Sequence, residues 1–199
     1  NSVSDNPLVF PDGDVISAGN FHAASTGQAM DIAAIAATEL GNISERRIFA
    51  LTKGDFGLPA FPTEEPGIRS GFMMGQVTAA ALASENKGLS HPATIDNIPT
   101  GADQEDHVSM APWAGRKLFQ IIQNLEYIFA IEILCACQAI EFRKGLKPGR
   151  GVLLAFNLIR KHIPKITEDR ILKDDFELAV DLIKSGELID AIENEFKLK

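Results

Sequence analysis

Apolar residues recur with a helical period along two long stretches of the chain. Between residues 22 and 53, Ile32, Ile35, Leu40 and Ile43 share a broad apolar face, which predicts an amphipathic helix. From Glu105 to about Arg143 the apolar positions leave few polar interruptions on any side. A helix that is apolar nearly all round is buried on most sides. The second stretch therefore predicts a long, deeply packed helix.

Proline and glycine separate these elements. Helix-breaking prolines and glycines predict loops at residues 1–20, 54–67 and 88–104. The segment 68–87 between them has an apolar face and many small residues, and we interpret Gly71 and Gly75 as helix-packing glycines. We expect no strand.

After Lys147-Pro148-Gly149, amphipathic patterns predict short helices near 151–162, 168–184 and 186–196. The prediction is an all-α protein, a long-helix bundle followed by short C-terminal helices. We place a division between a core, 1–147, and a small peripheral segment, 148–199.

Length and composition limit the possible partners. The chain has 199 residues, 45% of them hydrophobic and 23% charged, with a formal net charge of −8. No basic cluster is present, so neither nucleic acid nor an anionic membrane is an expected partner. No apolar run reaches membrane-spanning length without polar interruption, so we expect no membrane span. A helix from 105 to 143 would be roughly 50–60 Å long. Since one small domain can hardly bury it, we expect a bundle completed by other chains or by more of this one.

Cysteine and histidine positions exclude several kinds of site. The cysteines are Cys135 and Cys137, which point to different sides of a helix and can neither pair nor bind one metal together; a cytoplasmic location fits them. The histidines form no HxH or HxxxH pair, so we expect no metal. Because the chain begins Asn1-Ser2-Val3, we expect a part of something longer.

Two polar clusters have a plain structural interpretation. Asn20, in Gly19-Asn20-Phe21-His22, is a good residue for a helix N-cap. The acidic cluster 103–107 would suit the N-terminus of the long helix, where negative charge is favourable. On residue chemistry alone, that cluster is a capping feature.

The combination of motifs favours a further interpretation. Seven short motifs follow one another in a fixed order, and together they resemble the histidine ammonia-lyase family over residues 1 to about 145. They are Ser2-Val3-Ser4-Asp5-Asn6-Pro7-Leu8, Gly19-Asn20-Phe21-His22, Ser44-Glu45-Arg46-Arg47, Ser70-Gly71-Phe72-Met73, Ala83-Ser84-Glu85-Asn86-Lys87, His91-Pro92-Ala93 and Gln104-Glu105-Asp106-His107-Val108-Ser109-Met110. Beyond residue 148 the resemblance is faint.

The resemblance implies a fold, a reaction and a cofactor. The family builds homotetramers from very long helices and converts L-histidine to urocanate and ammonia. Its electrophile, 4-methylidene-imidazol-5-one (MIO), forms from an internal Ala-Ser-Gly that this sequence does not contain. The implied partner is therefore an N-terminal lyase segment or subunit that carries Ala-Ser-Gly, and the isolated chain is expected to be inactive.

The resemblance also implies site residues. Phe21 matches the phenylalanine that packs beside cofactor and substrate, and Glu105 matches the glutamate that faces the substrate side chain, a catalytic and substrate-binding position. Gln104 is an adjacent substrate-binding candidate. A carboxylate at 105 suits an imidazole, because it can accept the ring N–H hydrogen bond. The sequence differs from the family at Asp103, commonly asparagine, and at Ala23-Ala24-Ser25 after His22.

The sequence is compatible with two functions from different classes. The first is the C-terminal portion or subunit of a histidine ammonia-lyase, contributing active-site walls and the oligomer core. The alternative is a non-catalytic helical scaffold or regulatory protein derived from the lyase fold.

Overall fold

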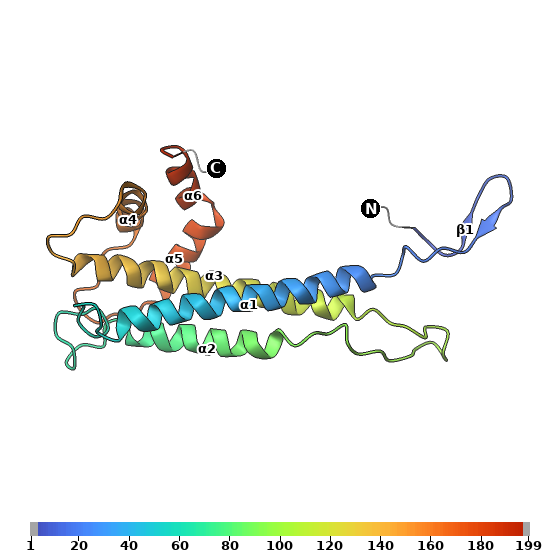
Figure 1. Ribbon diagram of the computed structural model, residues 1–199, viewed down its shortest axis with the longest axis horizontal. Coiled ribbons are helices and arrows are strands. Elements are labelled where there is room, and N and C mark those ends of the chain that lie inside the picture. Colours follow the sequence, from blue (N-terminus) through green and yellow to red (C-terminus); the bar gives the residue numbers. More distant parts are fainter. Residues whose placement is uncertain (1–3, 197–199) are drawn as a thin grey trace. The chain divides into compact units, whose positions relative to one another are not determined.

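The computed structural model describes residues 4–196, which fall into two compact units (Figure 1). The first unit contains the residues up to 36 together with 88–121, and the second contains 37–87 together with the residues from 122 onward. Residues Asn1, Ser2 and Val3, with which the first sequence motif begins, lie outside the described part of the chain.

Helices are the main regular secondary structure of both units, as the sequence predicts. The long helices are α1 (Ala24–Thr52), α2 (Met73–Leu89) and α3 (Ala111–Glu141). The short C-terminal helices are α4 (Arg150–His162), α5 (Lys173–Lys184) and α6 (Glu187–Glu193). The expected helix over 22–53 is confirmed as α1, and the three expected short helices are α4, α5 and α6.

The start of α3 differs from the prediction. The helix begins at Ala111 and not at Glu105, because the backbone of Met110 between them has positive φ, which no α-helix accommodates. The interpretation of cluster 103–107 as a helix cap is therefore wrong. Pro112 stands in the first turn of α3, where proline is tolerated, and it marks the true start.

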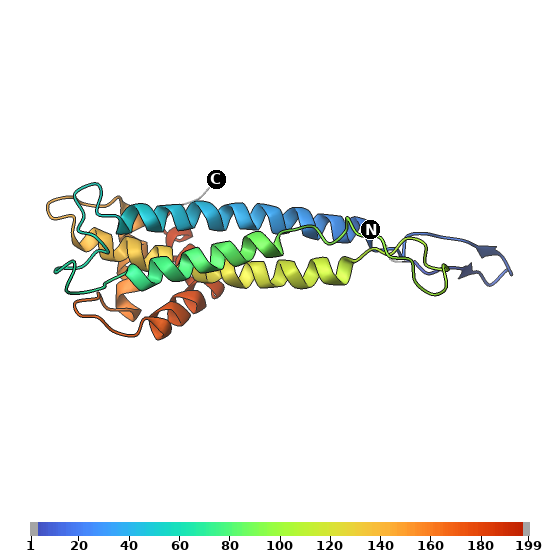
Figure 2. The ribbon, with the colours of Figure 1, turned by 90° about the horizontal axis from the view of Figure 1, so that it is seen from below.

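In the second unit, the later part of α1, α2 and the later part of α3 run side by side (Figure 1, Figure 2). Their apolar faces meet those of α4 and α5 in one cluster. Its largest members are Ile48, Phe72, Ile128, Ile131, Leu134, Ile159, Ile163, Phe176 and Leu182. Residues on both sides of position 147 share this cluster; the division of the chain at that point stays a prediction.

Two glycines of the second unit allow close packing in different ways. A Cβ on Gly75 would lie 3.2 Å from Phe72 and 3.5 Å from Ile131, so Gly75 is a helix-packing glycine as predicted. Gly71 lies before α2 with φ of 50°, and a Cβ there would lie 2.3 Å from the Phe61 carbonyl oxygen. Gly71 is therefore needed for a backbone approach and not for helix packing.

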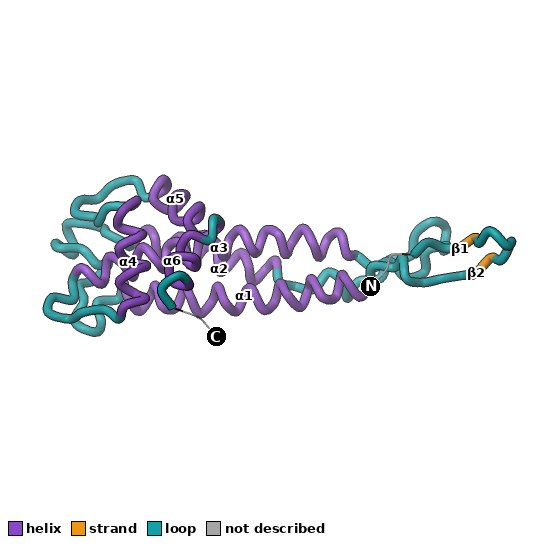
Figure 3. The backbone as a smooth tube through the Cα atoms, turned by 90° about the horizontal axis from the view of Figure 1, so that it is seen from above, coloured by secondary structure: helices purple, strands orange, loops and turns teal. Residues whose placement is uncertain are grey.

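A small hairpin precedes α1 in the first unit and was not expected. Strands β1 (Leu8–Val9) and β2 (Val15–Ile16) pair antiparallel, with Leu8 opposite Ile16, and Figure 3 shows them in orange. The Asn6 side-chain oxygen accepts hydrogen bonds from the Ser17 hydroxyl (3.0 Å) and the Ala18 N–H (3.2 Å). Asn6 thereby ties together the two chain segments that flank the hairpin.

The expectation that no segment could span a membrane is not met by α3. This helix is long and apolar enough to cross a membrane by length and composition alone. The core helix of a soluble bundle passes the same test. The polar residues of α3 are also committed to protein partners: Asn124 donates to Asn86 (2.9 Å), and Gln138 donates to the Ile166 carbonyl (2.8 Å). These contacts are those of a helix within a protein core.

Candidate active site

The motif Gly19-Asn20-Phe21-His22 forms the entry to α1. The helix starts at Ala24, whose backbone N–H donates to His22 Nδ1 at 3.2 Å. His22 therefore supplies a side-chain acceptor at this helix end. Because Nδ1 accepts, the ring proton is carried by Nε2, which fixes the tautomer of the neutral imidazole.

His22 also joins two motifs that are far apart in the sequence. Its Nε2 lies 2.8 Å from the carbonyl oxygen of His107, and in the tautomer given above it donates a hydrogen bond to that oxygen. The two imidazole rings stack with centroids 5.2 Å apart and planes 11° from parallel. The segment of Phe21 and the segment of Glu105 are thereby held next to each other within the first unit.

Glu105 ends a tight turn. Thr100 and Glu105 exchange backbone hydrogen bonds of 3.1 and 3.2 Å, and Gly101, Ala102 and Asp103 between them all have positive φ. Such conformations are strained for residues other than glycine and persist only where surrounding contacts enforce them. Aspartate and asparagine are the non-glycine residues best suited to this region. Asp103 therefore keeps the backbone preference that an asparagine would bring to this position.

One contact that enforces the turn comes from Asn97. Its side-chain amide donates to the Asp106 carbonyl and its side-chain oxygen accepts from the Val108 N–H, both at 2.9 Å. The two bonds hold the irregular segment directly after Glu105 against the loop that precedes the turn.

Asp31 on α1 anchors the loop that precedes this turn. Its Oδ2 accepts hydrogen bonds from the Ala93 N–H (2.9 Å), the Thr94 N–H (2.9 Å) and the Thr94 hydroxyl (2.8 Å). Burial opposes ionisation, but the bonds from Thr94 and Ala93 and the charge of Lys117 outweigh it and lower the pKa of Asp31. A buried carboxylate thus anchors the loop of the His91-Pro92-Ala93 motif.

Lys117 on α3 completes this anchor. Its side chain is 6% exposed, its Nζ lies 3.8 Å from Asp31 Oδ1, and it donates a hydrogen bond to the His91 carbonyl. Both helices of the first unit therefore hold residues 91–94 through buried polar groups. The sequence motif pointed to this loop, but the roles of Asp31 and Lys117 were not predicted.

The predicted site residues are placed at the surface of the first unit. The Phe21 ring is 46% exposed and packs edge-on against His22, with ring centroids 6.3 Å apart. Gln104 and Glu105 are exposed, with Gln104 inside the turn and Glu105 at its end. The structure brings the segments of these residues together and leaves their side chains available to a ligand. Among residues 4–196, no cluster of three or more His, Cys, Asp or Glu side chains could hold a metal.

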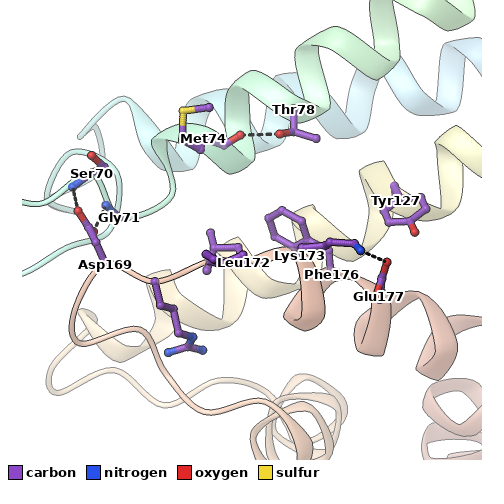
Figure 4. A pocket seen from close by; sticks show the side chains of 12 residues that line it. Ser70, Gly71, Met74, Thr78, Tyr127, Asp169, Leu172, Lys173, Phe176 and Glu177 are labelled. Carbon is purple, nitrogen blue, oxygen red and sulfur yellow. Dashed lines mark hydrogen bonds and ion pairs between the residues drawn. The ribbon is translucent and has the colours of Figure 1, made fainter.

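The second unit contains a cavity of about 570 Å³ that is separate from these residues (Figure 4). The Asp169 carboxylate closes one end by accepting the Ser70 and Gly71 N–H bonds at 2.7 and 2.9 Å. Those bonds hold the pKa of Asp169 below its usual value. Lys173 and Glu177 pair with each other at 3.6 Å on the cavity wall. The polar groups here already bind one another, and neither Phe21, Gln104 nor Glu105 lines the cavity.

The helical fold and the joined motifs are those of one class of protein. The family model described as aromatic amino acid lyase matches residues 1–161, and the chain belongs to this family. Its relatives include histidine ammonia-lyase of Treponema denticola, 52% identical over 200 residues, which cover 99% of this chain and 39% of the relative. The similarity thus extends beyond residue 148, where the sequence motifs gave only a faint resemblance.

Solved structures agree with this assignment. The crystal structure of histidine ammonia-lyase from Trypanosoma cruzi is similar with a TM-score of 0.90 and 44% identity, over 96% of this chain and 38% of that one. Tyrosine aminomutase from Streptomyces globisporus has a TM-score of 0.90 and 34% identity, over 98% of this chain and 38% of that one. The chain spans about two fifths of the length of the relatives it matches.

Proposed function

We propose that this chain forms the C-terminal portion of a histidine ammonia-lyase, an enzyme that releases ammonia from L-histidine to give urocanate. The observation that carries the proposal is the His22–His107 contact. It holds the Phe21 and Glu105 segments side by side, and this supports the proposal because the resemblance assigns both residues to the active site. The high identity to histidine ammonia-lyases supports histidine as the substrate.

Glu105 is the proposed catalytic and substrate-binding residue. An exposed carboxylate at the end of a braced turn can accept a hydrogen bond from the imidazole N–H of a bound histidine. Its charge also favours the imidazolium form of that ring. Gln104, next to it, offers an amide as a further substrate contact.

Phe21 is the proposed wall of the cofactor and substrate site. Its half-exposed ring, fixed edge-on by His22, fits contact with a flat group such as MIO or an imidazole. When bound, MIO supplies the electrophile that activates the amino group for departure. This chain has no Ala-Ser-Gly from which MIO forms, so the proposal assigns that tripeptide to an N-terminal lyase segment or subunit.

The proposed protein is a cytoplasmic homotetramer, and the isolated chain is inactive. Exposed apolar residues on α1 support assembly: Ile32 is 69% and Leu40 54% exposed. Soluble monomers rarely leave extended apolar patches uncovered. Analytical ultracentrifugation tests the assembly, and a folded monomer at micromolar concentration would contradict it.

The experiment that tests the function compares the isolated chain with a full-length lyase polypeptide containing it. Urocanate formation, followed by ultraviolet absorbance, is expected only for the full-length protein. In that protein Glu105→Gln should lower kcat/KM for histidine by about tenfold or more, since it keeps the shape and removes the charge. Because Glu105 caps no helix, the melting temperature should stay nearly unchanged. Full activity of the variant would refute the assigned role, and no activity of the parent would favour a non-catalytic scaffold.

A further inference from the structure

Asp31 and Lys117 form an unusual support for a loop near the proposed active site. Both side chains are almost fully buried, at 5% and 6% exposure. Buried ion pairs are often no more stabilising than apolar residues of the same volume. Stability alone is therefore a weak reason for this pair, whereas its hydrogen bonds give the loop a defined position.

The contacts lead from Asp31 toward Glu105. Asp31 binds the backbone of Ala93 and Thr94, which fixes the start of the loop segment 93–97. At the end of that segment Asn97 binds the Asp106 carbonyl and the Val108 N–H. The residues on the far side of Glu105 are thus connected to the buried carboxylate through one short, hydrogen-bonded segment.

We propose that Asp31 is a positioning residue for Glu105 and acts through Asn97, an assignment that rests on the proposed function. Replacing the Asp31 carboxylate by a neutral amide weakens the hydrogen bonds that its Oδ2 accepts from Ala93 and Thr94, and it leaves Lys117 as an uncompensated buried charge. The loop then loses its fixed place, and Glu105 moves relative to the substrate. Misplacement by about 1 Å can reduce the rate by up to about a hundredfold.

A double-mutant cycle in the full-length lyase tests this coupling. Asp31→Asn is expected to lower kcat/KM for histidine about tenfold when Glu105 is present, and less than about twofold in the Glu105→Gln background. A purely structural defect would cost the same in both backgrounds, so equal losses overturn the proposal. Unchanged kinetics of Asp31→Asn also overturn it. Asp96→Asn is the matched control, since Asp96 is exposed in the same loop and outside these contacts; it should behave as the parent.

Asn97→Ala provides a second route if Asp31→Asn fails to fold. Asn97 is exposed, so its truncation leaves the core intact, and its effect should likewise vanish in the Glu105→Gln background.

Hydrogen exchange, followed by mass spectrometry, separates this proposal from the proposed function. Asp31→Asn should speed amide exchange across residues 93–108 and leave the helices of the second unit protected. If Glu105→Gln has no effect on turnover, the role of Glu105 fails. Faster exchange in the loop would still support the anchoring, and unchanged exchange would overturn it.

Discussion

Gly71 lies where the chain enters α2, with a backbone conformation and surroundings that both exclude a side chain. Its φ is 50°, and a Cβ would lie 2.3 Å from the carbonyl oxygen of Phe61 and 3.0 Å from Thr63. The left-handed conformation costs a residue with a Cβ about 1–2 kcal/mol. The Phe61 carbonyl cannot withdraw freely, because it accepts the Phe72 N–H bond at 3.0 Å. Overpacking of this kind adds about 1–3 kcal/mol.

The Gly71→Ala variant should therefore lose about 2–5 kcal/mol of unfolding free energy in the second unit. Urea unfolding followed by circular dichroism measures this loss. Two other glycines distinguish the backbone cost from the packing cost. Among the described residues, nothing lies within 4 Å of a Cβ on either Gly145 or Gly88, so an alanine there adds no overpacking.

Gly145 has φ of 84°, so Gly145→Ala should show the backbone cost alone, about 1–2 kcal/mol. Gly88 lies in the last turn of α2, so Gly88→Ala carries neither cost and should instead stabilise, by at most about 0.5–1 kcal/mol. If Gly71→Ala lowers the unfolding free energy no more than Gly145→Ala does, the Phe61 carbonyl has moved aside and the packing argument is wrong.

Three further predictions concern titration, reactivity and strain. The lowered pKa of Asp31 means that its carboxylate contributes stability above the unfolded-state pKa of about 3.9 and loses it as pH falls through the lower folded-state pKa. Thermal melts should thus show the gap between the parent and Asp31→Asn shrinking below about pH 4; a constant gap would contradict the shift. Burial raises the pKa of Cys135 to about 12 and of Cys137 to about 11, so neither thiol should react with a disulfide reagent at mildly alkaline pH until the second unit unfolds. Rapid labelling of the native protein would refute that burial. Ala102→Gly should stabilise the first unit by about 1 kcal/mol in urea unfolding, because glycine adopts the positive φ of 55° without strain, and a loss of stability would disprove the strain.

The apolar period was sufficient to predict the long helices but not the start of α3. An acidic cluster before an apolar run looks like a helix N-terminus, since the macrodipole favours it. Here the backbone of Ala102 and Asp103 turns into the left-handed region before the helix begins. No local preference dictates that turn at Ala102; the backbone hydrogen bonds between Thr100 and Glu105 close it, and Asn97 holds the residues that follow it.

The ordered motifs were enough to identify the family, because short motifs in a fixed order do so without any knowledge of contacts. Phe21 and Glu105 follow from them as site candidates, and the structure shows that their segments lie together. The motifs could not identify Asp31, which on its own is an ordinary polar position of an amphipathic helix. The hairpin of β1 and β2 was missed because two-residue strands leave no alternating pattern.

The structure also explains why the Glu105 turn is held by polar groups rather than by apolar packing. Apolar contacts are non-directional, and a turn packed only by them could shift slightly at small cost. Asn97 holds the residues after Glu105 by hydrogen bonds, and Asp31 holds the loop that carries Asn97; such bonds fix orientation as well as position, since their geometry tolerates little distortion. The His22–His107 contact adds a third constraint from the Phe21 side. The proposed role of Glu105, accepting a hydrogen bond from the N–H at the edge of an imidazole ring, needs this kind of support, and polar contacts in the first unit provide it.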